Sequence, residues 1–193
     1  MENNKQEENA KKMLLSLGLD INDEHLQDTP KRIVKMYKEV FSGLLQENEP
    51  KFTVFNNPDY NEMIIIQGKF SSMCSHHFLP FLGEFYFGYI PDKKICGLSK
   101  IPRVVEYFAK RPQVQERLTQ QIIDYLDEKL KPKGCILVMK AKHYCSILRG
   151  VKQDEDYANT TTSAVKGIFL KPEPGKNPKE EFLSLIKNGN GVH

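Results

Sequence analysis

Two short clusters of cysteine and histidine stand out in this sequence of 193 residues. The first occupies residues 74–77 and reads CSHH, and the second occupies residues 143–145 and reads HYC. Together they offer two thiolates and three imidazoles, which are ligands that zinc prefers in proteins. A closed structural site would use four of these groups, whereas a catalytic site would use three and leave one position open. The alternative is that the clusters are unrelated, with a core cysteine, a histidine at the end of a strand and a surface pair.

The spacing within each cluster constrains the local backbone. Cys74 and His77 would face opposite sides of a straight strand, so they can share an ion only if the chain turns between them. We therefore predict a loop or turn for this segment. His143 and Cys145 lie two residues apart, and in a strand both side chains would leave the same face.

A group of polar residues stands at the start of a predicted helix. Ser99, Lys100 and Arg103 lie around the first turn, where a helix N-terminus favours anions and the basic side chains add charge. Arg149 follows the second cluster closely. These residues indicate a site for a phosphate-bearing ligand.

One carboxylate has a possible role in recognising a base. Glu116, next to Gln115, lies in a helical segment, and a carboxylate there is able to accept two hydrogen bonds from the edge of a guanine. From the spacing alone, a solvated helix residue paired with a nearby cation is the simpler interpretation. The same holds for the lysines and arginines at positions 31–38, which we interpret as a solvated helix face.

Composition narrows the class of protein. The net charge of +3, from 28 basic and 25 acidic residues, is too small to indicate nucleic-acid binding by itself. No apolar run is long enough for a membrane span, and the first residues lack the apolar core of a secretory signal. We therefore expect a cytoplasmic protein with no membrane or nucleic-acid partner, whose four cysteines are free thiols or metal ligands. Cys96 and Cys135 lie in apolar segments and are expected in the core.

The elements that must position these residues follow from the hydrophobic period. Apolar residues at helical spacing predict helices over residues 9–19, 29–43, 103–110, 113–130 and 180–187. Apolar and β-branched runs predict strands over residues 52–55, 63–70, 85–90, 135–139 and 161–169, with the last two paired as a hairpin. Runs of strands separated by helices favour an α+β fold with an antiparallel sheet. We expect an N-terminal helical region at 1–50 and a catalytic domain at 51–193.

Several motifs in order give the chain a resemblance to a known family. It resembles GTP cyclohydrolase I of the zinc-dependent type, from about residue 14 to the C-terminal helix. The residues that carry the resemblance are CSHHF at 74–78, GLSK at 97–100, RPQVQERLT at 111–119, HYC at 143–145, RG at 149–150, NTTTS at 159–163 and DTPKRIVKMY at 28–37. The order of several motifs makes the match specific, whereas any one of them is weak.

The resemblance implies a role for each group of residues. It implies Zn²⁺ bound by Cys74, His77 and Cys145, with His76 and His143 as the proton-transfer pair and Ser99 assisting near the sugar. It implies that Glu116, helped by Gln115, binds the guanine. The triphosphate would be held by Ser99, Lys100, Arg103 and Arg149, with Lys35 or Arg32 reaching in from the first helical region.

The resemblance also implies an architecture and an assembly. The expected fold is the tunnelling fold, an antiparallel sheet with two helices packed on one face. Subunits would pair their sheets into rings, and two stacked pentamers would form a homodecamer with sites between subunits. One departure is visible, because Ser75 stands where the family usually has glutamate. This change alters the charge beside the zinc site but removes none of the implied ligands.

The reaction implied is the hydrolysis of GTP to 7,8-dihydroneopterin triphosphate and formate, the first step of folate and pterin synthesis. Three alternatives belong to other classes. A related tunnelling-fold nitrile reductase would need a nucleophilic cysteine and no metal. A zinc-stabilised binding protein would use four ligands, and the two spare histidines disfavour it. A nucleic-acid binder is poorly supported by the charge.

Overall fold

The computed structural model of the chain describes residues 2–189. By its internal contacts the chain divides into two compact units, Met1–Ser42 and Gly43–His193. The N-terminal region expected from the sequence ends at residue 50, eight residues after the end of the first unit. No helix among the described residues is both long and apolar enough to cross a membrane.

The first unit is a pair of helices, α1 (Glu2–Ser16) and α2 (Thr29–Val40), which pack against each other. Pro30 lies in the first turn of α2, where its missing N–H costs no hydrogen bond. The N-cap is Asp28, so the helix begins at Thr29, the first residue of the predicted range. Both helices were expected, with α1 beginning earlier than its apolar spacing indicated.

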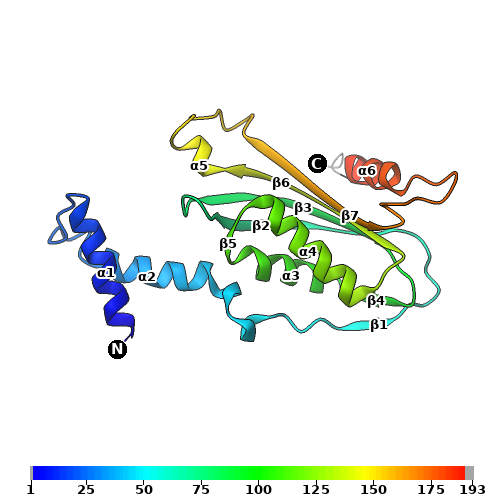
Figure 1. Ribbon diagram of the computed structural model, residues 1–193, viewed down its shortest axis with the longest axis horizontal. Helices are drawn as coiled ribbons and strands as arrows, with labels where there is room; N and C mark the ends of the chain where they lie inside the picture. Colours follow the sequence, from blue (N-terminus) through cyan, green and yellow to red (C-terminus); the bar gives the residue numbers. More distant parts are fainter. Residues whose placement is uncertain (1, 190–193) are drawn as a thin grey trace. The chain divides into compact units, whose positions relative to one another are not determined.

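The second unit is built on a five-stranded sheet of order β5-β2-β3-β6-β7 (Figure 1). The strands are β2 (Ile64–Cys74), β3 (Pro80–Ile90), β5 (Pro112–Gln113), β6 (Gly134–His143) and β7 (Asn159–Gly167). All neighbours are antiparallel except β2 and β5, which are parallel. The pairing of β6 with β7 confirms the predicted hairpin.

Two helices cover one face of this sheet (Figure 1). They are α3 (Lys100–Ala109) and α4 (Gln115–Leu130), and their apolar stripes pack on β2, β6 and β7. Leu118, Ile122 and Leu126 of α4 are fully buried there together with Phe85 of β3. This core fixes α4 across the strands that carry the histidine and cysteine clusters.

The other face is covered in part by α6 (Pro178–Gly189), which buries Phe182 against Tyr86, Ile136 and Phe169 (Figure 1). A separate two-stranded sheet joins β1 (Val54–Asn56) to β4 (Lys94–Cys96). Short 3₁₀ turns span Ser42–Leu44 and Gln46–Asn48. The α+β architecture, with its largely antiparallel sheet and two helices on one face, confirms the predicted fold class.

Two local predictions are wrong. A helix was expected from residue 113, but Gln113 lies with Pro112 in β5, and α4 begins at Gln115. Cys145 was expected in the same strand as His143, but the strand ends at His143 and the helical turn α5 (Tyr144–Ile147) follows. In both places pairing with a neighbouring strand, rather than local propensity, decides where the element ends.

Candidate active site

The first cluster lies at the turn between β2 and β3, as its spacing required. The N–H of Cys74 donates to the carbonyl of Leu79 and the N–H of Phe78 donates to the carbonyl of Cys74, at 2.8 and 2.9 Å. Phe78 has a φ of 51°, in the left-handed region that closes tight turns. This turn brings His77 back over Cys74, so that the two side chains meet.

The two clusters meet at one end of the sheet. The ligand atoms of Cys74, His77 and Cys145 all lie within 4.8 Å of one another, and we call these residues the Cys–His–Cys group. Cys74 Sγ and His77 Nδ1 are 3.8 Å apart. Two donors on one tetrahedral zinc ion would be separated by about 3.5–3.8 Å, given Zn–S and Zn–N bonds of about 2.3 and 2.0 Å. The group therefore fits a metal ion in both donor type and spacing.

The thiols of this group influence each other. Burial raises the pKa of the Cys145 thiol, and its hydrogen bond with Cys74 raises that pKa further. Two neighbouring thiolates repel each other, so both ionise readily only when a cation lies between them. A cation between them would therefore favour ionisation of both thiols.

His143 lies beside this group at the end of β6, and its ring is held on two sides. The ring of Phe81 stacks on it with 4.5 Å between centroids and 5° between planes. Its Nε2 lies 2.7 Å from Oε1 of Gln115. Burial lowers the pKa of His143, and the nearby carboxylate of Glu116 opposes that effect. His143 is therefore an imidazole that is neutral near pH 7 and fixed in orientation.

Gln115 has a different environment from the one expected for a guanine ligand. Its side chain is 1% exposed, and the two N–H groups of its Nε2 are shared among three acceptors, Met139 O, Thr160 O and Thr162 Oγ1, at 3.0–3.1 Å. Every polar atom of its carboxamide is thus engaged inside the protein. Glu116, by contrast, is exposed in the first turn of α4 and leaves its carboxylate accessible.

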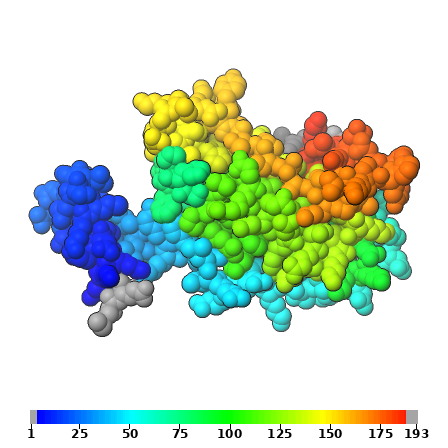
Figure 2. All heavy atoms as spheres, viewed as in Figure 1, coloured from blue at the N-terminus to red at the C-terminus, as the bar shows by residue number. Residues whose placement is uncertain are grey.

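Arg149 reaches the site from the loop that follows α5. Its Nη1 lies 3.2 Å from Nε2 of His77, while the ring of His76 lies 6.2 Å from that of His77. In Figure 2 the residues around position 150, in yellow, protrude beside the β2–β3 turn, in green-cyan. A guanidinium in this position places positive charge at the rim of the site.

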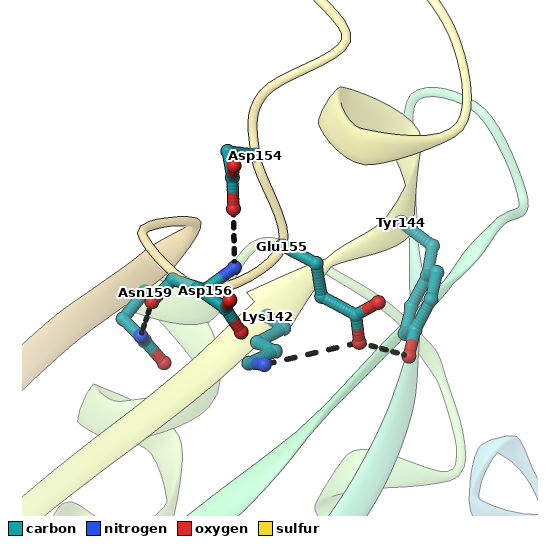
Figure 3. Close-up of polar contacts among 6 residues, drawn as sticks. All are labelled: Lys142, Tyr144, Asp154, Glu155, Asp156 and Asn159. Carbon is teal, nitrogen blue, oxygen red and sulfur yellow. Dashed lines mark hydrogen bonds and ion pairs between the residues drawn. The ribbon is translucent and has the colours of Figure 1, made fainter.

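The segment at 148–158, which we call the Arg149 loop, is tied back to the sheet. Figure 3 shows the carboxylate of Glu155 between the Tyr144 hydroxyl, which donates to it at 3.3 Å, and the ammonium of Lys142 at 3.8 Å. Asn159 donates to the carbonyl of Asp156 at 3.3 Å at the end of the loop. These contacts attach the loop to the residues on either side of His143.

Three predicted phosphate residues lie elsewhere in the same unit. Ser99 precedes α3, and Lys100 and Arg103 occupy its first turn, whereas the other end of the helix is joined to β2 by a hydrogen bond from Ser72 Oγ to Ala109 O. A helix of ten residues is about 15 Å long, so this chain alone does not bring them to the Cys–His–Cys group. Lys100 Nζ instead donates to Lys51 O at 3.0 Å.

The last two predicted residues belong to the first unit. Arg32 and Lys35 are exposed on α2, and Arg32 lies 3.4 Å from Asp28 in an i,i+4 ion pair. Cys96 and Cys135 are buried in the core, as expected. Phe81, Thr162 and Glu155 support the site but carried no signal in spacing, because their contacts join segments far apart in the sequence.

Comparison with known proteins identifies the family. The model of the GTP cyclohydrolase I family matches residues 6–187. A GTP cyclohydrolase 1 of Sulfurihydrogenibium sp. is 45% identical over 190 residues, covering 97% of each chain. That of Carboxydothermus hydrogenoformans is 48% identical over 163 residues, covering 83% of this chain and 84% of the relative. That of Aquifex aeolicus is 45% identical over 175 residues, covering 90% and 91%.

The fold and the site define an α+β protein whose sheet carries a candidate metal site, the Cys–His–Cys group, at one end. The chain belongs to the GTP cyclohydrolase I family, and it is an enzyme of that family. A solved structure of the archaeosine synthase QueF-Like in the apo form matches 54% of this chain and 93% of that chain, at 13% identity and a TM-score of 0.45. That likeness is too low to bear on function.

Proposed function

We propose that this chain opens the imidazole ring of the guanine of GTP by hydrolysis, giving 7,8-dihydroneopterin triphosphate and formate. The observation that carries the proposal is the Cys–His–Cys group lying beside His143 at one end of the sheet, in a chain of this family. The reaction adds water at C8 and breaks the ring, so it needs an activated water and groups that move protons.

The Cys–His–Cys group is the proposed zinc site. Two thiolates and one imidazole are a common donor set for zinc, and three protein ligands leave a fourth position for water or substrate. When bound, zinc supplies Lewis acidity that makes water nucleophilic near neutral pH. Ser75, within the turn, adds no charge of its own to this group.

The proposed proton-transfer residues are His76 and His143. Histidine suits this role because its pKa lies near the working pH. The lowered pKa of His143 keeps its ring neutral and ready to accept a proton, while the exposed His76 is free to reach the purine. Glu116 is the proposed partner of the guanine N1–H and exocyclic amine, because its carboxylate offers two acceptors beside His143.

The triphosphate would be held by Arg149 of this chain together with residues from neighbouring copies. Ser99, Lys100 and Arg103 lie about one helix length away in the same chain, and Lys35 or Arg32 belong to α2. We propose that a homodecamer of two stacked pentamers brings these residues to the sites of adjacent chains. We place the enzyme in the cytoplasm, where reducing conditions keep the cysteines free.

Incubation of the purified, zinc-loaded protein with GTP tests this function. We expect formate and a dihydropterin triphosphate in equal amounts, measured as released formate and as pterin fluorescence after oxidation. Protein treated with a chelator is the control and should release neither. Zinc-loaded protein that binds GTP but releases no formate would refute the proposal.

A further inference from the structure

The carboxamide of Gln115 lies in a closed set of hydrogen bonds whose donors and acceptors can be assigned. The hydroxyl of Thr119 donates to the backbone carbonyl of Gln115 at 2.8 Å. Thr119 has a single proton to donate, so in its 2.6 Å contact with Thr162 the hydroxyl of Thr162 is the donor. Thr162 therefore has no proton left for Gln115 and accepts from Gln115 Nε2 at 3.1 Å.

The same assignment fixes which end of the carboxamide faces His143. Gln115 Nε2 also lies 3.1 Å from Met139 O and 3.0 Å from Thr160 O, and backbone carbonyls only accept hydrogen bonds. Turning the carboxamide over would place its oxygen against these two carbonyl oxygens at a buried site, where the repulsion and the lost bonds are costly. Oε1 therefore faces His143.

An oxygen that only accepts requires a donor opposite it. His143 Nε2, at 2.7 Å from Gln115 Oε1, must carry the ring proton, and a neutral imidazole has only one N–H. The remaining nitrogen, Nδ1, then holds a lone pair. The stacked ring of Phe81 holds the plane of the imidazole, which keeps Nε2 directed at Gln115.

We propose that Gln115 is a positioning residue that fixes His143 with its proton on Nε2, so that His143 exchanges protons with the substrate through Nδ1. The inference rests on the proposed proton-transfer role of His143. It assigns Gln115 a task other than binding guanine, since its side chain is buried and its polar atoms are all engaged. Thr119, Thr162 and two backbone carbonyls set its orientation in turn.

A neighbouring glutamine provides a matched control. Gln113 is also 1% exposed, and its Nε2 donates to Phe108 O and to Gln121 Oε1, both at 2.9 Å. Its side chain also accepts from Arg117 Nε and bonds to neither a catalytic histidine nor the Cys–His–Cys group, although its backbone pairs with that of Cys74 in the β5–β2 ladder. Gln113→Met removes a buried carboxamide of the same size two residues away, so it measures the cost of disturbing the core alone.

The experiment compares steady-state formate release, zinc content and melting temperature for Gln115→Met, Gln115→Glu and Gln113→Met. We expect Gln115→Met to lower kcat by about 10–100-fold with KM for GTP within about threefold, because a positioning group acts after substrate is bound. Gln115→Glu keeps an acceptor toward His143 but places its second oxygen against the carbonyls of Met139 and Thr160, so we expect it to lower the melting temperature while kcat falls less than in Gln115→Met. Gln113→Met should lower the melting temperature and leave kcat within about twofold.

The double variant Gln115→Met/His143→Ala separates this inference from the role of His143. If Gln115 acts through His143, the double variant loses no more kcat than His143→Ala alone.

Active His143→Ala would refute the proposed role of the histidine, whereas inactive His143→Ala with fully active Gln115→Met would refute only the positioning role. A rise in KM at constant kcat for Gln115→Met would assign Gln115 to guanine, and an equal loss of kcat in Gln113→Met would overturn the inference. If Gln115→Met does not fold, Gln115→Leu, which also removes the acceptor, takes its place in the same comparisons.

Discussion

His77 and His143 lie at the same end of the sheet but meet different atoms. His77 Nδ1 faces the sulfur of Cys74 at 3.8 Å, whereas His143 Nε2 faces an amide oxygen at 2.7 Å. We expect His77→Ala to lose zinc and activity together. His143→Ala should keep its zinc and its fold while turnover falls by about 10²–10⁴-fold, the usual size of a general acid–base contribution. Metal analysis and formate release on the two variants check this, and zinc loss in His143→Ala alone would reverse the assignment.

Glu116 is the exposed acid beside His143, so its removal tests recognition of the base. Without it, two guanine donors lose a charged acceptor, and we expect Glu116→Ala to lower kcat/KM for GTP by about a hundredfold or more. Glu128→Ala, at the far end of α4, is the matched control because it is also an exposed helical glutamate. Equal kinetics for the two variants would contradict the guanine role.

At the scale of the element, β6 carries a buried thiol at its start and the catalytic candidate at its end. Cys135 is completely buried, and burial, followed by the charge of Asp127, raises the pKa of its thiol from the ordinary 9.0. The folded state therefore keeps this proton at a pH where the unfolded chain releases it. Stability from this group is complete below pH 9 and is lost as the pH rises above it.

The expected loss is about 1.4 kcal/mol in the free energy of unfolding by pH 10, since one proton is released on unfolding. Cys135→Ala removes this titration, so its unfolding free energy should fall less steeply than that of the wild type between pH 8 and 10. Val138→Ala, in the same strand, should be destabilised equally at both pH values. Denaturant unfolding at several pH values measures these slopes, and parallel slopes for wild type and Cys135→Ala would contradict the assignment.

The elements that sequence patterns predicted well are those whose apolar period is set by one large core. The apolar stripe on α4 packs against the sheet, and the apolar run of β6 lies within that sheet and pairs with β7. The ends of the elements were predicted less well. Pro112 pairs with Met73 of β2 and so lies in a strand, and β6 ends at His143.

The candidate site likewise contains some features that local sequence patterns predict and others that they do not. The turn between Cys74 and His77 could be predicted from their spacing, because these two side chains would face opposite sides of a straight strand. The contacts of Gln115 come from residues 24 to 47 positions away, and no local pattern contains them. The resemblance supplied the remaining roles, including that of Glu116, for which spacing alone favoured a solvated residue.

At the scale of the whole molecule, the sheet leaves long stretches of backbone unpaired within the described chain. β7 has a neighbour on one side only, and on its outer side β2 pairs with β5 only at Met73 and Cys74. Open edges of this length favour pairing with other chains. We expect light scattering of the active enzyme to report about 220 kDa for ten chains of 22.3 kDa. A fully active monomer would contradict a site shared between chains.

A metal ion in the Cys–His–Cys group would link parts of the sheet that are not neighbours. Cys74 ends β2 and Cys145 follows β6, with β3 between them in the sheet order. A bound ion therefore closes a loop of about 70 residues, a constraint worth about 4 kcal/mol in the chain-entropy account of cross-links. A Cys74–Cys145 disulfide, formed by an oxidant after metal loss, would close the same loop. The oxidised, metal-free enzyme and the metal-bound enzyme would then melt at similar temperatures. Thermal stability is therefore a poor measure of the active fraction of a preparation.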